Sequence, residues 1–389
     1  MISESIEKIS NNKAKSSFAM RDAMVRSVAV LGAGNGGFAA AADLARLGYD
    51  VRLWARNPER LRAVQAHGGI AMKGVHEGFV PLRNVTTDIG EAVNGADLVM
   101  PVLPSIGLED CATRLAPMMS PDRIVFINPG HTGGGLLFVA ALRAAGYSKP
   151  VQTCETVTLT HMCRMADAST VNVFSYGENL SFAAFPGRIG ERLYQVIGKI
   201  FPRIKRASSV LETAFMNINA TFHPAGMLMN AGWIEHTQGN FLFYHEGMSE
   251  SVARVAEAVD QERMAIARAL NIPTVSFLEV FHQVGLTSRQ GMESGSIRAA
   301  CLASEPNRTV KSPPSLRHRY IYEDVGYGLV PMMEFARLAG VATPAMDALV
   351  TLANFALGID LRETGLTLRK MGLANKKPAE LTRFVETGE

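Results

Sequence analysis

Short apolar runs alternate with helix-like segments through the first half of the chain. A continuous apolar run is typical of a buried strand, and an amphipathic or alanine-rich segment between two runs is typical of a connecting helix. This alternation predicts an α/β fold. The runs that predict strands are Val28–Leu31, Asp50–Trp54, Ala96–Val102, Arg123–Ile127, Val151–Leu159, Val171–Ser175 and Ser181–Pro186.

Glycines with the spacing G-x-G-x-x-G follow the first predicted strand, and an alanine-rich helical segment begins among them. Gly32 permits a tight turn, Gly34 lets a pyrophosphate approach the backbone, and Gly37 lets the helix pack close to the strand. The free amides at the start of this helix, where Asn35 and Gly36 lie, attract phosphate. The segment therefore predicts a Rossmann-type dinucleotide-binding domain.

The end of the second predicted strand indicates which dinucleotide binds. An acidic residue there selects NAD, but Trp54–Pro58 contains none, whereas Arg56 could pair with a 2′-phosphate. We therefore expect NADP as the preferred cofactor and NAD as the alternative, with a solvated Arg56 as the simpler interpretation. Pro104, in the turn after the strand that begins at Ala96, should also lie at the cofactor because ligands gather at the carboxyl ends of such strands.

From about residue 188 the strand-like runs fade and long helical periodicities replace them. Helices are predicted over about 249–270, 330–338 and 344–357. We therefore expect a loose N-terminal extension (1–24), a Rossmann dinucleotide-binding domain (25–187) and a mostly α-helical substrate domain (188–389).

Composition narrows the class of protein further. The chain has 389 residues, enough for two domains, and its net charge of +3 with no basic run gives no support for nucleic acid binding. No apolar run is long enough to span a membrane, and no signal peptide is recognisable. The four cysteines and nine histidines lack metal-ligand spacing, so we expect no metal. A cytoplasmic location is the resulting expectation.

Two polar stretches in the second half could supply chemistry beside a nicotinamide. His223 precedes Pro224 in an otherwise apolar helical segment, and a histidine can move a proton near neutral pH. The stretch from Arg319 to Asp324 holds an arginine and two adjacent carboxylates. The arginine could clamp a substrate carboxylate, and one of the carboxylates could orient an imidazole. From the residues alone, a structural role for His223 is as good an interpretation as a catalytic one, and a solvated loop before a helix is the slightly favoured interpretation of the second stretch.

The chain resembles the opine dehydrogenases, the octopine/nopaline dehydrogenase family, over nearly its whole length. The order and spacing of several short motifs together carry the resemblance. They are Gly32–Gly37, the Asn-x-x-x-His223-Pro224 segment with Asn230, Arg319–Asp324, the region from Gly226 to Asp260–Arg263, and Thr343-Pro344.

This resemblance implies a two-domain enzyme that uses NADH or NADPH. Such enzymes condense the amino group of an amino acid reductively with an α-keto acid, often pyruvate, through an imine, and they also run the reverse oxidation. The resemblance implies that His223 transfers protons, that Asp324 is its acidic partner and that Arg319 holds a substrate carboxylate. The expected partners are these small molecules, with a homodimer as a possible assembly.

Several alternatives remain open at this stage. Asp260 is the second candidate for the acid beside His223, ranked lower because surface ion pairing with Arg263 would explain it. A reductase of the glycerol-3-phosphate or ketopantoate kind shares the first domain, but the catalytic lysine of those enzymes is missing from Asn217–Asn230. A non-catalytic NADP(H)-binding sensor is the third alternative. His131, in a second glycine-rich loop, could touch substrate or be merely solvated.

Overall fold

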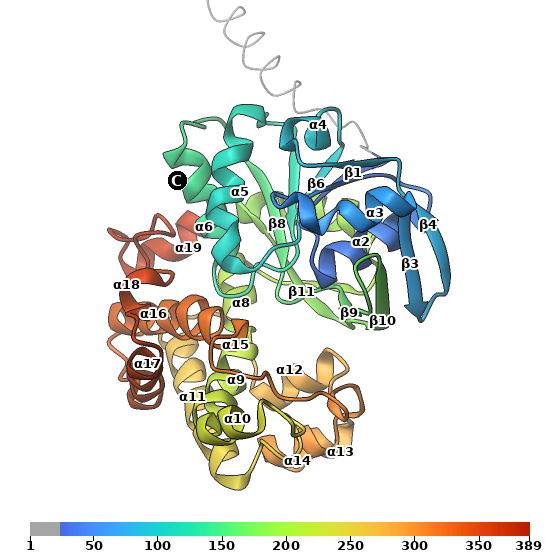
Figure 1. Cartoon of the computed structure of the whole chain (residues 1–389). Coiled ribbons are helices and arrows are strands. Elements are labelled where there is room, and N and C mark those ends of the chain that lie inside the picture. The colour runs from blue at the N-terminus through green and yellow to red at the C-terminus, as the bar shows by residue number, and fades with distance from the viewer. Residues whose placement is uncertain (1–23) are drawn as a thin grey trace, which may run out of the picture.

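The computed structural model describes residues 24–389 and shows two stacked parts (Figure 1). A part built on β-sheets forms the upper half of the view, and a helical part in yellow to red lies below it. The predicted N-terminal extension, 1–24, lies outside the described residues except for its last residue. Within residues 24–389, no helix has both the length and the apolar character needed to cross a membrane.

The first part is organised around an eight-stranded sheet of order β12-β11-β8-β7-β6-β1-β2-β5. β1 (Ser27–Leu31) is parallel to β2 (Asp50–Trp54) on one side and to β6 (Leu98–Pro101) on the other. The chain runs outward past β2 and then resumes at β6, so its direction of winding reverses between β1 and β6. Ligands of such sheets bind at this reversal, beyond the carboxyl ends of the strands. The remaining strands are β5 (Asn84–Thr86), β7 (Ile124–Ile127), β8 (Gln152–Thr156), β11 (Leu180–Phe185) and β12 (Ile204–Arg206).

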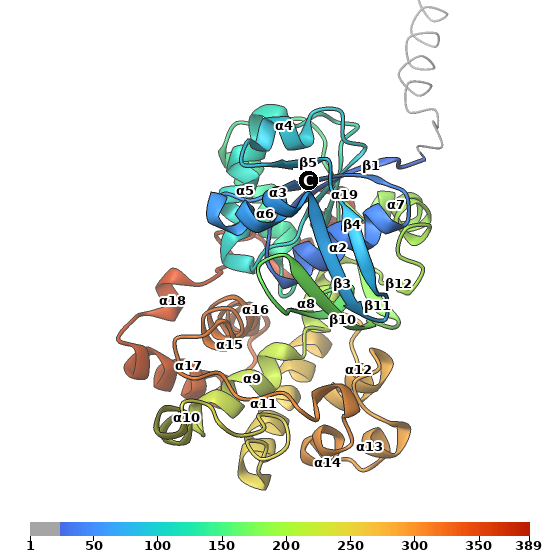
Figure 2. The same cartoon turned by 45° about the vertical axis from the view of Figure 1, so that its right-hand side comes forward.

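α2 (Asn35–Arg46) is buried on nearly all sides because it lies between two sheets (Figure 2). The second sheet has four strands in the order β4-β3-β10-β9, and β10 pairs with β3 in parallel. Its strands are β3 (Gly69–Gly74), β4 (Gly78–Pro81), β9 (His161–Met165) and β10 (Thr170–Tyr176). The alanine-rich sequence of α2 suits this position, since small side chains allow close packing on both faces. The other helices of this part are α3 (Arg62–His67), α4 (Ile89–Val93), α5 (Leu108–Leu115), α6 (Gly134–Ala144) and α7 (Gly190–Gly198).

The helical part packs around α11 (Glu250–Ala269), its longest described helix. The apolar positions that predicted this helix, among them Val252, Val259 and Ile266, are buried. The other helices are α8 (Val210–Phe215), α9 (Asn219–Leu228), α10 (Ala231–Thr237), α12 (Phe277–Gln283), α13 (Arg289–Glu293), α14 (Ile297–Leu302), α15 (Arg319–Tyr322), α16 (Val330–Ala339), α17 (Pro344–Leu357), α18 (Leu361–Thr364) and α19 (Pro378–Thr387).

The sheet continues past residue 187, where the sequence pattern suggested a boundary. β12 pairs with β11 in parallel, Leu180 opposite Ile204, and α7 is the helix that connects them. A crossover helix at this point has the same periodicity as the first helix of a helical domain, so the pattern could not separate the two. The last helix of the chain, α19, also packs against this sheet: Phe384 contacts Phe185 of β11 with ring centroids 5.4 Å apart.

Candidate active site

The three motif glycines lie at the turn from β1 to α2, and two of them, Gly32 and Gly37, leave no room for a Cβ atom. Gly32 has a φ of +133°, and a Cβ atom there would lie 2.3 Å from the Val102 carbonyl oxygen. A Cβ atom on Gly37 would lie 1.8 Å from the carbonyl oxygen of Gly32. Gly34 is the N-cap of α2, and no atom lies within 4 Å of its Cβ position. This open backbone at a helix N-terminus fits a dinucleotide pyrophosphate.

Asn35 and Gly36 form the first residues of α2. The Asn35 side chain accepts a hydrogen bond from the Met165 amide at 2.8 Å, which ties the start of α2 to β9. A Cβ atom on Gly36 would lie 2.7 Å from the Leu159 side chain. Packing thus accounts for both residue types, while the N-cap, a glycine, has no side chain that could occupy the first amides of the helix. Cofactor contact by Asn35 and Gly36 stays a prediction.

Arg56 and Pro104 lie just beyond the carboxyl ends of β2 and β6, respectively. Arg56 is 3.1 Å from Asp110 in an ion pair whose two side chains are both exposed. An exposed pair of this kind is weak, so the Arg56 guanidinium remains accessible to a phosphate. Pro104 is the residue before a short helical turn that begins at Ser105. Contacts of Arg56 and Pro104 with a cofactor remain predictions.

The fold brings His223 and Asp324 together across 101 positions of sequence. His223 lies on α9, which contains Pro224, and its Nδ1 is 2.7 Å from Oδ2 of Asp324. Asp324 follows α15 and immediately precedes a short π-helix, Val325–Leu329. Both side chains are buried. A π-helical segment inserted in a helix often marks a functional site, and here it adjoins the buried acid.

Burial lowers the pKa of His223, and the nearby charges of Arg319 and His131 act in the same direction. Asp324 acts in the opposite direction, but the net pKa of His223 is lower than usual, so the ring is neutral at neutral pH. A carboxylate accepts hydrogen bonds only, so Nδ1 carries the hydrogen of the neutral ring. Nε2 therefore presents a lone pair that can accept a proton.

Arg319, the first residue of α15, is the exposed cation nearest this pair in sequence. Its guanidinium carbon lies 5.9 Å from the ring centre of Tyr320, and Tyr320 stacks on His223 with centroids 3.8 Å apart. Neighbouring side chains partly desolvate the guanidinium and oppose its charge, but Glu323 and Asp324 outweigh that effect and raise the pKa of Arg319. Across residues 24–389, the guanidinium has no hydrogen-bond acceptor. A charged, unpaired fork of donors suits a carboxylate.

Tyr244 was not identified from the sequence. Its hydroxyl lies 2.9 Å from Nε2 of His223 and 3.1 Å from the hydroxyl of Tyr320. The residue sits in an irregular segment after α10, among apolar neighbours that resemble core positions. No local pattern distinguishes it, because its significance depends only on what it contacts in space.

The second glycine-rich loop, which follows β7, meets the helical part beside His223. Nε2 of His131 is 3.3 Å from Oε1 of Glu323, and the backbone amide and hydroxyl of Ser105 donate to the same oxygen at 2.9 and 3.1 Å. Asn217 of the helical part donates to the Thr132 hydroxyl at 2.9 Å. His131 is thus buried at the junction of the two parts rather than solvated, and no described atom bonds its Nδ1.

Asp260 does not pair with His223. It forms a buried ion pair with Arg263 at 2.7 Å and also accepts a hydrogen bond from the Phe277 amide. Arg263 is fully buried and donates to the carbonyl oxygen of Val275 at 2.7 Å. The expectation of surface ion pairing was therefore wrong. Asp260 and Arg263 do form an ion pair, but they lie on the buried face of α11 and hydrogen-bond to the segment that precedes and begins α12.

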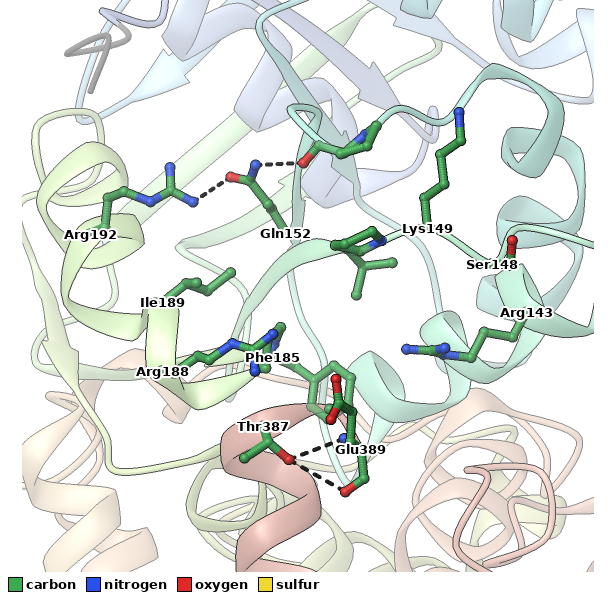
Figure 3. A pocket seen from close by; sticks show the side chains of 15 residues that line it. Arg143, Ser148, Lys149, Gln152, Phe185, Arg188, Ile189, Arg192, Thr387 and Glu389 are labelled. Atoms are coloured by element: carbon green, nitrogen blue, oxygen red, sulfur yellow. Dashed lines mark hydrogen bonds between the residues drawn. The ribbon is translucent and has the colours of Figure 1, made fainter. Parts of the chain in front are cut away.

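Two further features lie apart from this site. Within residues 24–389, no His, Cys, Asp and Glu side chains are grouped three or more together to hold a metal ion. A cavity of about 210 Å³ lies near the start of β8, at the end of the sheet opposite the glycine turn. Arg143, Lys149, Arg188 and Arg192 surround it, with Arg192 donating to Gln152 (Figure 3). None of the predicted site residues lines this cavity.

A glycine turn at the reversal point of a parallel sheet, joined to a helical part with a buried His–Asp pair, defines a two-domain, nicotinamide-dependent dehydrogenase. Two family models match the chain accordingly. Residues 27–132 match the NAD-dependent glycerol-3-phosphate dehydrogenase N-terminus. Residues 206–357 match the NAD/NADP octopine/nopaline dehydrogenase α-helical domain, whose start coincides with the end of the sheet.

The chain belongs to the opine dehydrogenase family. It is 34% identical to an opine dehydrogenase of Arthrobacter sp. (strain 1C) over 362 residues, which cover 93% of this chain and 99% of that one. Octopine dehydrogenase with NADH and pyruvate has a similar fold, with a TM-score of 0.72, 21% identity and coverage of 93% and 98%. Yersinopine dehydrogenase with NADP⁺ bound gives a TM-score of 0.70 at 16% identity, with the same coverage. The protein is an NAD(P)-dependent oxidoreductase acting on CH–NH groups.

Proposed function

We propose that this enzyme condenses the amino group of an amino acid reductively with an α-keto acid such as pyruvate, using NADPH in preference to NADH. The reverse reaction oxidises the product back to these two substrates. The observation that carries this proposal is the buried His223–Asp324 pair, 2.7 Å apart. Next to it lies Arg319, which is exposed and whose guanidinium has no hydrogen-bond acceptor among residues 24–389.

Each of these three residues has a distinct task in the proposed mechanism. Neutral His223 accepts an N–H proton as the amine attacks the keto carbon and passes it to the keto oxygen. It transfers the second N–H proton in the same way as that oxygen leaves as water and the imine forms. Asp324 holds the tautomer and stabilises the imidazolium that forms. Arg319 anchors a substrate carboxylate with two parallel hydrogen bonds. The bound nicotinamide supplies the hydride that reduces the imine.

Binding of the dinucleotide would involve Gly32, Gly34 and Gly37, with Arg56 placed to pair with a 2′-phosphate. The support for NADPH is the position of Arg56 beyond β2, together with the absence of a carboxylate from Trp54–Pro58. Arg56→Ala should raise KM for NADPH about 10-fold or more and leave KM for NADH nearly unchanged. Equal effects on both cofactors would remove the support for NADPH.

The test of the activity is a panel of amino acids against several α-keto acids, with NADPH and NADH oxidation followed at 340 nm. We expect oxidation only when both an amino acid and a keto acid are present. Oxidation with a keto acid alone would favour a simple reductase instead, and no oxidation with any pair would favour a cofactor-binding sensor. His223→Asn should lower turnover by about 10²–10⁴-fold. His236→Asn, which changes an exposed histidine on α10, is the matched control.

A further inference from the structure

The basic nitrogen of His223 is covered by a tyrosine hydroxyl. Nε2 of His223 lies 2.9 Å from the hydroxyl of Tyr244, and only 3% of the His223 surface is exposed. Phe222, Phe243 and Tyr320 pack around the same ring. The immediate hydrogen-bonding neighbour of Nε2 is therefore the Tyr244 hydroxyl rather than solvent.

The hydrogen bonds of this cluster have one consistent direction. Nδ1–H of His223 donates to Asp324, so the Nε2 lone pair must accept from the Tyr244 hydroxyl. Because the Tyr244 hydrogen is used in this way, the Tyr320 hydroxyl donates to the Tyr244 oxygen at 3.1 Å. Burial raises the pKa of Tyr244 well above its usual value, so its hydrogen stays in place at neutral pH. The result is a directed chain that runs from Tyr320 to Asp324.

We propose that the Tyr244 hydroxyl relays protons between His223 and the substrate, and that the Tyr320 hydroxyl holds the Tyr244 oxygen in line. This inference rests on the proposed function, since it needs His223 as the proton acceptor. Tyr244 is then the group through which the histidine acts, and His223 stays covered throughout the reaction.

The proton transfers balance in both directions. As the amine nitrogen bonds to the keto carbon, its N–H proton moves to the Tyr244 oxygen, and the original Tyr244 proton moves to Nε2 of His223. The imidazolium formed keeps its Nδ1–H bond to Asp324. Nε2 then returns its proton to Tyr244, and the Tyr244 proton passes to the alkoxide oxygen, which becomes the hydroxyl group of a neutral adduct. As the C=N bond forms, the second N–H proton takes the same path through Tyr244 and His223 to that hydroxyl group, which leaves as water. No redox change occurs in these transfers.

Tyr244→Phe tests the relay because it removes one oxygen and retains the ring that packs against Phe222 and Phe243. We expect kcat to fall by about 10–100-fold, within the usual range for proton-transfer groups. KM for the keto acid and Kd for NADPH should change less than about 3-fold, since the change concerns a proton transfer rather than binding. Tyr322→Phe is the matched control, because the Tyr322 hydroxyl has no hydrogen bond within the described residues.

The pH profile separates a relay from a packing role. Tyr244 donates to the neutral form of His223, so its removal raises the pKa of His223. The acidic limb of kcat/KM should move to higher pH in Tyr244→Phe and stay in place in Tyr322→Phe. The remaining charged or titratable groups around His223 are the same in both variants; they are Asp324, Arg319, His131, His318 and Tyr320.

Three outcomes would overturn the relay. If Tyr244→Phe has the kcat of the wild type and the acidic limb of its kcat/KM profile does not move, then Tyr244 only packs. If its kcat is higher than that of the wild type, then Tyr244 only blocks access to His223. If Tyr244→Phe fails to fold by circular dichroism, Tyr320→Phe replaces it, with an expected loss in kcat of about 3-fold or more. An unchanged kcat in Tyr320→Phe would then refute the chain. Failure of the proposed function is distinguishable, because the wild type itself would show no oxidation that depends on an amino acid.

Discussion

Glu155 allows a quantitative test of how the second glycine-rich loop is held. Only 1% of this β8 residue is exposed, and its two oxygens accept hydrogen bonds from the Thr213 hydroxyl at 2.5 Å and the Gly135 amide at 2.8 Å. A Cβ atom on Gly130 or Gly135 would lie 2.2 or 2.4 Å from Glu155. The carboxyl group thus sits directly beneath the loop and joins it to α8 of the helical part.

Burial raises the pKa of Glu155 from 4.5 to about 7, although its two hydrogen bonds act in the opposite direction. An acid with a raised pKa binds its proton more tightly in the folded state. Its full contribution to stability is therefore present below pH 4.5 and is lost as the pH rises through 7. The difference between the pKa of Glu155 in the unfolded and folded states corresponds to roughly 3.4 kcal/mol in the free energy of unfolding. Roughly 2.5 kcal/mol of this is lost between pH 5 and pH 8.

Glu155→Gln should remove this pH dependence. The amide is neutral at every pH, its oxygen can accept from Gly135, and its NH₂ group can donate to the Thr213 hydroxyl. The single hydrogen of that hydroxyl is then free to donate to the Val210 carbonyl. The free energy of unfolding, from urea titrations followed by circular dichroism, should fall by roughly 2.5 kcal/mol more in wild type than in the variant from pH 5 to pH 8. Parallel curves would refute the reasoning. Exposed Glu235→Gln should match wild type.

Three further predictions follow from the geometry. Gly37→Ala should raise Kd for NADPH about 10-fold or more, because the structure has no room for a Cβ atom at this position. Gly198→Ala is the control and should leave Kd unchanged, because the space around Gly198 is open. Titration of each variant with NADPH measures both values. Arg319→Lys should raise KM for the carboxylate substrate about 10-fold without changing Kd for NADPH, and equal KM values would exclude the clamp. Burial opposes ionisation of Asp43, but hydrogen bonds from His161 and a neighbouring arginine hold its pKa at about 2. Asp43→Asn should therefore cost about 2 kcal/mol at pH 7, and an equal cost at pH 2 would contradict this sign.

The glycine turn could be predicted from sequence because its causes are local. Gly32, Gly34 and Gly37 act within one strand–turn–helix unit, in which Gly32 and Gly37 leave no room for a Cβ atom and Gly34 lies open at the helix N-terminus. The four-stranded sheet could not be predicted as a unit, since it pairs β3 with β10, which lies far along the chain. The domain boundary expected after residue 187 also could not be checked from local patterns, because only the pairing of β12 with β11 shows that the sheet continues beyond it.

The site residues also differ in how far the sequence could predict their roles. His223 and Asp324 were named as partners from the family resemblance, while the sequence pattern alone left both open. Asp260 had the same residue type and a similar polar setting, and only the direction in which α11 turns it excludes it. Tyr244 carried no signal at all, since a tyrosine among apolar neighbours is typical of a core. Its role depends on a 2.9 Å contact with a residue on another segment.

The adjacent carboxylates Glu323 and Asp324 show how one short segment can connect the two parts of the enzyme. Successive residues of a helical segment point about 100° apart, so neighbouring side chains face different surroundings. Asp324 turns toward His223 within the helical part, whereas Glu323 turns toward Ser105 and His131 of the sheet-containing part. The segment that orients the proposed proton acceptor is therefore the same segment that docks against the turn after β6. The interface between the parts and the orientation of His223 thus depend on one backbone segment.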